Sequence, residues 1–196
     1  MPWEKSFDEA EVVDQAMQVF WEKGYAATSI SDITTATGIK RGSLYNAFAG
    51  KRDLFLQALL KYGNGQRREQ IARLEQCDSA CEAIFGFLDF IVQTAVNDPN
   101  RRGCLLINTS LDYAQYDEEI QRVVTDAFLE LTRFFEKQIR RGQRQGEISE
   151  TIAPRATANS LVSVVVGIQV LGRGAMGKTA LQQMAEQAKR LVTPEC

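Results

Sequence analysis

The segment from Thr28 to Lys51 concentrates side chains that could bind the phosphates and base edges of a nucleic acid. Arg41 could make two hydrogen bonds to one guanine edge, and Lys51, at the start of a predicted helix, could pair with a phosphate. Small residues would let the backbone and hydroxyl groups come close to phosphates, which bulky side chains would prevent; these are Ser29, Ser31, Gly42 and Ser43. Together they indicate a nucleic-acid interface.

Two short helices joined by a tight turn would position these groups. Ser29 and Asp32 have the spacing of a capping box that begins the first helix, and Gly38 ends it. A second helix over residues 41–48 completes the layout of a helix-turn-helix. Apolar side chains should pack the two helices together and leave Tyr45 facing outward, namely Ile33, Ile39, Leu44 and Phe48. The alternative is an ordinary turn between helices with a solvated charged face.

Apolar residues spaced three and four apart predict helices through the rest of the chain. The expected helices are about 7–23, one from 51 onward, and "ACEAIFGFLDFIVQTAV" with Asp78 or Ser79 as its cap. They continue with the short helix "CLLINTSLDYA", a long helix started by Asp117 that ends at about 145, and the ranges 154–171 and 179–192. The total is about nine helices, so we predict an all-α fold. We expect a three-helix helix-turn-helix domain over residues 1–50 and a larger helical domain over residues 51–196.

Composition and charge narrow the classes of protein. The chain has 196 residues, 44% of them hydrophobic, and its net charge of −2 excludes a generally basic nucleic-acid coat. Between residues 31 and 61, however, five bases against two acids leave a local charge of +3. Histidine is absent, which removes Ser-His and Cys-His catalysis and the usual zinc ligand sets. We therefore expect neither a metal nor a cofactor, even at the cysteine pair Cys77 and Cys81.

Neither a secretion signal nor a membrane span is expected from the sequence. The stretch "MPWEKSFDEAEVVD" is charged from its fourth residue. The longest apolar run, residues 161–171, falls short of the ~20 residues that cross a bilayer. We therefore expect a cytoplasmic protein, whose four cysteines are thiols rather than a disulfide framework: Cys77, Cys81, Cys104 and Cys196.

The stretch "GYAATSISDITTATGIKRGSLYNAFAGKRDLFLQAL" resembles the N-terminal domain of the TetR/AcrR family of bacterial transcriptional repressors, with a match over roughly residues 8–60. It has the glycine that closes the first helix, the Thr-Ser start of the second, the Gly-Ile and Gly-Ser-Leu-Tyr groups, and the later lysine and leucine. The resemblance implies DNA contacts from Ser29, Ser31, Lys40, Arg41, Ser43, Tyr45 and Lys51. One departure is Asn46-Ala47, where many members carry a histidine or an aromatic residue.

The resemblance also implies partners for the larger domain. Members of this family bind a near-palindromic DNA operator as homodimers, through two recognition helices about one helical turn, ~34–36 Å, apart. The last two helices of each subunit form the dimer interface, and a small-molecule ligand bound by the larger domain changes DNA affinity. We therefore expect a homodimeric repressor that a small molecule or a cysteine modification releases from its operator.

The ligand and the sensing residues are less strongly indicated. Side chains that could line a ligand cavity are Phe85, Phe90, Asn108, Tyr113, Phe128 and Phe135, although aromatic residues at helical spacing are more often plain core. Cys104 follows Arg101 and Arg102 at a predicted helix start, and both features favour the reactive thiolate. Its setting also resembles the Gly-Cys-Leu of family members that sense electrophiles or oxidants. The alternative is a small residue that packs at a helix start.

One further motif competes with this interpretation. "GRGAMGKT", residues 172–179, matches the phosphate-binding loop pattern and follows an apolar run that could be a strand. Only 17 residues remain after Thr179, too few for the further strands and the acid that a nucleoside triphosphatase needs. A glycine-rich turn between the last two helices is the simpler account, so we do not expect an enzyme. A helical interaction module that does not bind DNA is the other alternative.

Overall fold

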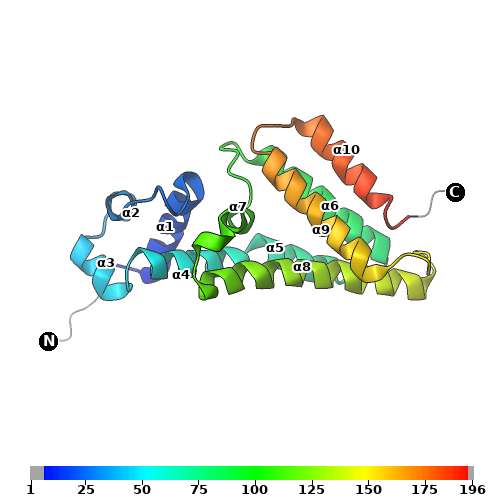
Figure 1. Ribbon diagram of the computed structural model, residues 1–196, viewed down its shortest axis with the longest axis horizontal. Helices are drawn as coiled ribbons and strands as arrows, with labels where there is room; N and C mark the ends of the chain where they lie inside the picture. Colours follow the sequence, from blue (N-terminus) through cyan, green and yellow to red (C-terminus); the bar gives the residue numbers. More distant parts are fainter. Residues whose placement is uncertain (1–6, 194–196) are drawn as a thin grey trace.

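The computed structural model describes residues 7–193, and over that range the chain forms α-helices, one 3-10 helix and no strand (Figure 1). The elements are α1 (Glu9–Lys23), α2 (Ile30–Thr37), α3 (Arg41–Ala47), α4 (Lys51–Gly63), α5 (Gln66–Leu74), α6 (Ala80–Asn97), α7 (Leu105–Leu111), η1 (Tyr113–Gln115), α8 (Glu118–Gln145), α9 (Pro154–Leu171) and α10 (Lys178–Lys189). The predicted all-α fold is confirmed, with ten α-helices in the described range where about nine were expected.

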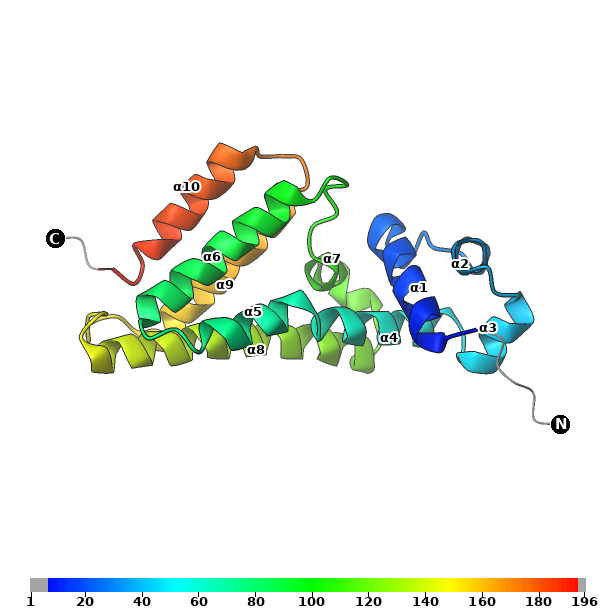
Figure 2. The same cartoon turned by 180° about the vertical axis from the view of Figure 1, so that it is seen from behind.

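The helices are arranged along one long axis. In Figure 1, α1, α2 and α3 lie at the left end, and α4, α5 and α8 run along the base of the molecule. Helices α6, α9 and α10 pack side by side above the other end, and α7 lies between the two groups; Figure 2 shows the same arrangement from behind. Helices α4 and α8 therefore connect the N-terminal helices to the rest of the molecule.

Local sequence signals set the ends of several helices. The side chain of Ser79 caps α6 and that of Asp117 caps α8, each accepting a hydrogen bond from a backbone N–H of the first turn. Gly146 ends α8 in a left-handed conformation, with φ 76°, which glycine adopts without strain. Pro154 occupies the first turn of α9, where its missing N–H has no partner to lose.

The helix expected from Lys51 onward is interrupted in the structure. It divides into α4 and α5 at Asn64 and Gly65, where the Gly65 N–H donates to the carbonyl of Tyr62 in a tight turn. Two glycines lie within three residues here, Gly63 and Gly65, and glycine has a low helix propensity. After this turn the first residues of α5 lie beside α8, as the contact of Arg67 with Glu130 shows.

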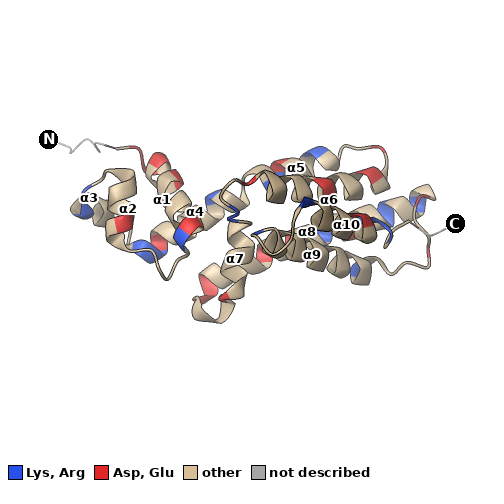
Figure 3. Cartoon of the chain, turned by 90° about the horizontal axis from the view of Figure 1, so that it is seen from above, with Lys and Arg blue, Asp and Glu red and all other residues tan. Residues whose placement is uncertain are grey.

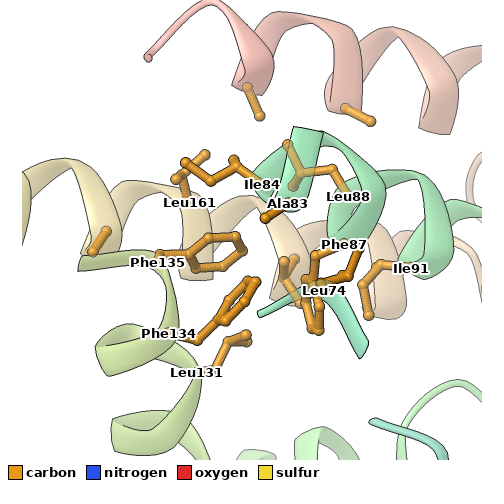
Figure 4. Close-up of a cluster of buried hydrophobic side chains, with 14 of the residues drawn as sticks. Leu74, Ala83, Ile84, Phe87, Leu88, Ile91, Leu131, Phe134, Phe135 and Leu161 are labelled. Carbon is orange, nitrogen blue, oxygen red and sulfur yellow. The ribbon is translucent and has the colours of Figure 1, made fainter. Parts of the chain in front are cut away.

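The buried side chains form two clusters. The larger one, which we call the C-terminal core, joins α5, α6, α8, α9 and α10, and Figure 4 shows its centre. There the ring of Phe87 packs against Phe134 and Phe135, with centroids 5.4 and 5.5 Å apart. All three side chains are buried, so this end of the molecule is held together mainly by apolar packing.

The second cluster, the N-terminal core, is built from α1, α2, α3 and α4. It also contains side chains from α7 and α8, namely Leu105, Leu106, Ile120 and Val124. In addition, the Nε of Arg52 in α4 donates to Asp117 at the start of α8, over 2.9 Å, and this bond holds the pKa of Asp117 well below its usual value. The domain boundary predicted between residues 50 and 51 falls at the first residue of α4 and stays a prediction.

Candidate nucleic-acid interface and internal cavity

Helices α2 and α3 and the turn between them have the geometry of a helix-turn-helix. Gly38 takes φ 68° after α2 and its N–H donates to the carbonyl of Thr34, which turns the chain toward α3. Ile33 and Leu44 are fully buried between the helices and hold their relative orientation. The outer faces of both helices are left free, and Figure 3 shows basic residues on α3 at this end of the molecule.

The structure brings most of the predicted DNA contacts to this outer face. The exposed residues among them are Ser29, Ser31, Lys40, Arg41 and Tyr45, and Ser43 is half-buried. The Cζ atom of Arg41 lies 5.8 Å from the ring centroid of Tyr45, a cation–π contact that restricts both side chains. Tyr45 is 47% exposed, so part of its side chain remains available to a partner.

Lys51 is placed differently from the other predicted contacts. Its Nζ donates to the carbonyls of Tyr25 and Thr28, at 2.8 and 2.7 Å, and lies 4.3 Å from the centroid of the Tyr25 ring. The ammonium therefore fixes the loop that leads into α2. Because an ammonium has three N–H donors, a phosphate contact from Lys51 would use the one that remains. The sequence pattern did not indicate the two carbonyl bonds.

Ser29 begins α2 through both halves of the capping box. Its Oγ accepts from the Asp32 N–H at 3.1 Å, and the Asp32 carboxylate accepts from the Ser29 N–H at 2.8 Å. Hydrogen bonds from Lys23 and Ser29 hold the pKa of Asp32 well below its usual value, so this carboxylate remains charged and paired. The start of α2 is thus fixed by local bonds.

Replacing Ser29 with alanine is expected to lower the free energy of unfolding by about 0.5–2 kcal/mol, because an orphaned helix N–H loses its acceptor. Urea unfolding followed by circular dichroism measures this change. Ser31→Ala is the matched control, because Ser31 is an exposed serine of the same helix whose side chain does not cap it. Equal stability of the two variants would contradict the role of the cap.

A cavity of about 1110 Å³ lies between the N-terminal helices and the helical body. Residues from α1, α4, α5, α6, α7, α8 and α9 line it, so it contacts both cores. Its apolar wall includes Phe87, Phe90, Ile91, Ile107, Phe128 and Leu131, and its polar wall includes Lys61, Arg67, Asp98 and Arg102. A concave, largely apolar space with a few polar groups is the usual form of a small-molecule site.

Only part of the predicted ligand set lines this cavity. Phe90 and Phe128 are on its wall. Phe135 is 0% exposed inside the C-terminal core, and Phe85 packs at the edge of that core under the ammonium of Lys189. Asn108 bonds to the carbonyl of Arg102 and to Arg173, and Tyr113 is an exposed residue of η1 whose hydroxyl meets Thr125. The helix spacing that suggested these four did not separate core and surface positions from the cavity wall.

Cys104 does line the cavity, at the residue that precedes α7. Its neighbour on the wall is Tyr62, whose pKa is raised well above its ordinary value by burial and by Cys104 beside it. The guanidinium of Arg102 contacts Trp21, Gln18 and Asp98 instead. Cys77 and Cys81 are also free thiols, and Cys196 lies outside the described residues.

The loop before α7 connects the cavity to the N-terminal helices, and the sequence did not indicate this contact. The indole N–H of Trp21 in α1 donates to the carbonyl of Gly103 over 3.0 Å. The Arg102 guanidinium lies 4.1 Å from the centroid of the Trp21 ring and donates to Gln18 of α1 over 2.7 Å. Because 82 residues separate Trp21 from Gly103, no local spacing could have revealed it.

The phosphate-binding loop motif has the structure of an ordinary interhelical turn. The apolar run before it belongs to α9, where a strand would be required, and Gly172 forms the C-cap of that helix. Gly177 then forms the N-cap of α10, which begins at Lys178. The strand–loop–helix context of a nucleotide site is therefore missing around residues 172–179.

Helix α6 is long and apolar enough to cross a bilayer, yet it packs against α5, α8, α9 and α10 as a core helix. Among residues 7–193, no group of three or more cysteine, aspartate or glutamate side chains is placed to hold a metal ion.

Comparison with known proteins decides the family. Residues 12–58 match the family model of bacterial regulatory proteins, tetR family, and residues 80–188 match that of the Tetracyclin repressor-like C-terminal domain. The chain belongs to the TetR family. Like other TetR-family members it is a DNA-binding transcriptional repressor, and homodimers and release by a small-molecule ligand are typical of the family. The predicted family and the predicted function as a DNA-binding repressor are therefore confirmed.

Relatives cover nearly the whole chain. The uncharacterized HTH-type transcriptional regulator YezE of Bacillus subtilis is 36% identical over 146 residues, 74% of this chain and 75% of YezE. The HTH-type transcriptional repressor ComR of Escherichia coli is 27% identical over 188 residues, 95% of this chain and 90% of ComR. A cysteine mutant of the TetR family regulator CifR, solved with 26-bp operator DNA, is 27% identical with a TM-score of 0.84, over 97% of this chain and 99% of that one.

Proposed function

We propose that this chain is a cytoplasmic, non-enzymatic repressor that reads a near-palindromic operator through the outer face of α2 and α3. The observation that carries the proposal is the exposure of Lys40, Arg41 and Tyr45 on one face of a helix-turn-helix whose inner face is buried. Arg41 would read a base edge, and small hydroxyl residues would meet phosphates. The contributing residues are Ser29, Ser31, Lys40, Arg41, Ser43 and Tyr45, with Lys51 as a loop anchor that can turn to a phosphate.

Selection of binding sites from a random pool of DNA duplexes tests this proposal. We expect the enriched site to be near-palindromic, with half-sites about one helical turn apart, and to bind two chains. Sedimentation of the protein with the selected duplex measures the stoichiometry. Enrichment of no common sequence would contradict operator recognition and would favour a protein partner for the N-terminal helices.

The second part of the proposal concerns release. A ligand in the cavity, or modification of the Cys104 thiol in its wall, would move the loop that carries Arg102 and Gly103. Since this loop is bonded to Trp21 and Gln18, the displacement would reach α1, which packs directly on α2 and α4. Coupling of this kind between a ligand site and a DNA site corresponds to a coupling free energy of about 1–3 kcal/mol.

Replacing Trp21 with phenylalanine is expected to weaken this coupling and leave operator binding nearly unchanged. A smaller aromatic ring remains in place of the indole, but the hydrogen bond to the carbonyl of Gly103 is lost, which is worth about 1 kcal/mol or roughly fivefold in affinity. Operator affinity is measured by fluorescence anisotropy with and without a compound that releases the unmodified protein.

The ratio of operator affinity without the compound to operator affinity with it should shrink about fivefold in Trp21→Phe. Gln15→Ala is the control and should keep the full ratio, because Gln15 is a half-buried residue of α1 whose side chain bonds to Glu11 of the same helix. A Trp21→Phe protein that responds as fully as the unmodified one would exclude this contact from the release mechanism.

A further inference from the structure

We propose that the cavity takes an apolar organic carboxylate and that Arg67 binds its carboxylate group. The inference rests on the proposed function in one respect, that this cavity is the ligand site. It follows from three features of the wall, which are unsatisfied buried donors, a surplus of positive charge, and a broad apolar surface.

The buried donors belong to the side chain of Arg67, in the first turn of α5. This residue lines the cavity and is only 16% exposed. Its Nη2 donates to the Glu130 carboxylate over 2.5 Å, but its Nε and Nη1 are buried and have no hydrogen-bond acceptor among residues 7–193. Buried donors almost always have a partner, because burial removes the water that would otherwise satisfy them. As the side chain stands, these two nitrogens are closed to water, so a ligand oxygen supplies the missing acceptor only when the Arg67 guanidinium turns toward the cavity.

The charge around this guanidinium favours an anion. Glu130 accepts from Arg67 and also from the Nε of Arg68, over 2.7 Å, so one carboxylate faces two guanidinium groups. Arg102, elsewhere on the cavity wall, likewise has a buried Nε without a hydrogen bond, and its distance to Asp98 is 3.8 Å. Four basic residues line the cavity against three acids, Asp14, Glu69 and Asp98, so the wall has one positive charge in excess. One carboxylate would balance it, and the planar fork of arginine matches its two oxygens.

The rest of the wall suits an apolar body. Aromatic and aliphatic side chains from α6, α7 and α8 form most of it, namely Phe87, Phe90, Ile91, Ile107, Phe128 and Leu131. Tyr62 and Cys104, which interact with each other, add two polar groups to this wall. A volume of about 1110 Å³ exceeds what a single ring fills, so a two-ring or longer body is expected.

Matched pairs of acids and amides test the inference on the full-length protein. The probes are 1-naphthylacetate with 1-naphthylacetamide and 4-biphenylacetate with 4-biphenylacetamide, each titrated by calorimetry at neutral pH. We expect each acid to bind at least tenfold more tightly than its amide, which has the same shape and no charge. Arg67→Gln should remove this difference.

Arg68→Gln is the matched control. Arg68 shares Glu130 with Arg67 but is 55% exposed and does not line the cavity, so the preference for the acid should persist. Arg67→Lys, which keeps the charge and loses the fork, should retain part of the preference. Three results would each overturn the inference. The unmodified protein could bind acid and amide equally, it could bind none of the four probes, or the preference for the acid could survive Arg67→Gln.

Operator binding by the same preparations separates this inference from the proposed function. If the protein binds its selected operator but shows no preference for the acids, the carboxylate proposal fails and the repressor proposal stands. If the acids bind as expected but no DNA sequence is selected, the cavity chemistry stands and the repressor proposal fails.

Discussion

Replacing Arg41 with alanine is expected to weaken operator binding about 5- to 150-fold. A bidentate contact with a guanine edge contributes about 1–3 kcal/mol of discrimination, and each 1.4 kcal/mol is tenfold in affinity. Arg41 is the first residue of α3 and is exposed. Its cation–π contact with Tyr45 already restricts the side chain, so less conformational freedom is lost when it binds DNA. Fluorescence anisotropy on the selected operator measures the change.

Arg144→Ala is the control for this substitution. Arg144 is an exposed arginine in the last turn of α8, at the opposite end of the molecule from α3 (Figure 1). Both variants lose one positive charge, so only a local contact can separate them. An Arg41→Ala protein that is folded and binds within twofold of the unmodified one would show that α3 does not read the operator with this residue.

Replacing Phe55 with alanine is expected to lower the free energy of unfolding by about 3–5 kcal/mol, the usual cost of removing a buried phenylalanine. Phe55 is 1% exposed in α4 and its ring meets those of Phe20, Tyr25 and Tyr116 at centroid distances of 5.0, 4.7 and 5.8 Å. These partners come from α1, from the loop before α2 and from the residue before Asp117. The cavity left behind would therefore loosen the junction between the N-terminal helices and α8.

Urea unfolding followed by circular dichroism measures this effect. Leu60→Ala in the same helix is the control, because Leu60 is 45% exposed and its truncation should cost far less. We also expect Phe55→Ala to bind the operator more weakly at a temperature where it remains helical. A loss of stability below about 1 kcal/mol would contradict the view that this aromatic group holds the two parts together.

The local features of the fold could be predicted because each depends on residues close in sequence. The capping pair Ser29 and Asp32, the helix end at Gly38, and the starts of α6 and α8 were all predicted from single residues whose side chains or backbone freedom satisfy a helix end. The exposed face of α3 followed from the same periodicity, because burial of Leu44 leaves Tyr45 on the other side.

Features that depend on distant contacts could not be predicted. Arg67 belongs to a strongly hydrophilic stretch, "GQRREQ", that is typical of a solvated helix. In the structure, however, the Arg67 side chain packs against α8 and donates to Glu130. The bonds of Lys51 to two carbonyls and of Trp21 to Gly103 likewise appear only when the chain is folded. The break between α4 and α5 is the exception, since the glycines at positions 63 and 65 were a signal for it.

The salt dependence of binding to the selected operator tests the central claim most directly. Anisotropy titrations at several salt concentrations, on the operator and on a scrambled duplex of equal length, give both the slope and the sequence preference. We predict affinity for the operator that falls steeply as salt rises, because several phosphates are neutralised, and that exceeds affinity for the scrambled duplex by about 10³ or more. Equal, weak binding to both duplexes would contradict the assignment of α2 and α3 as an operator-reading surface.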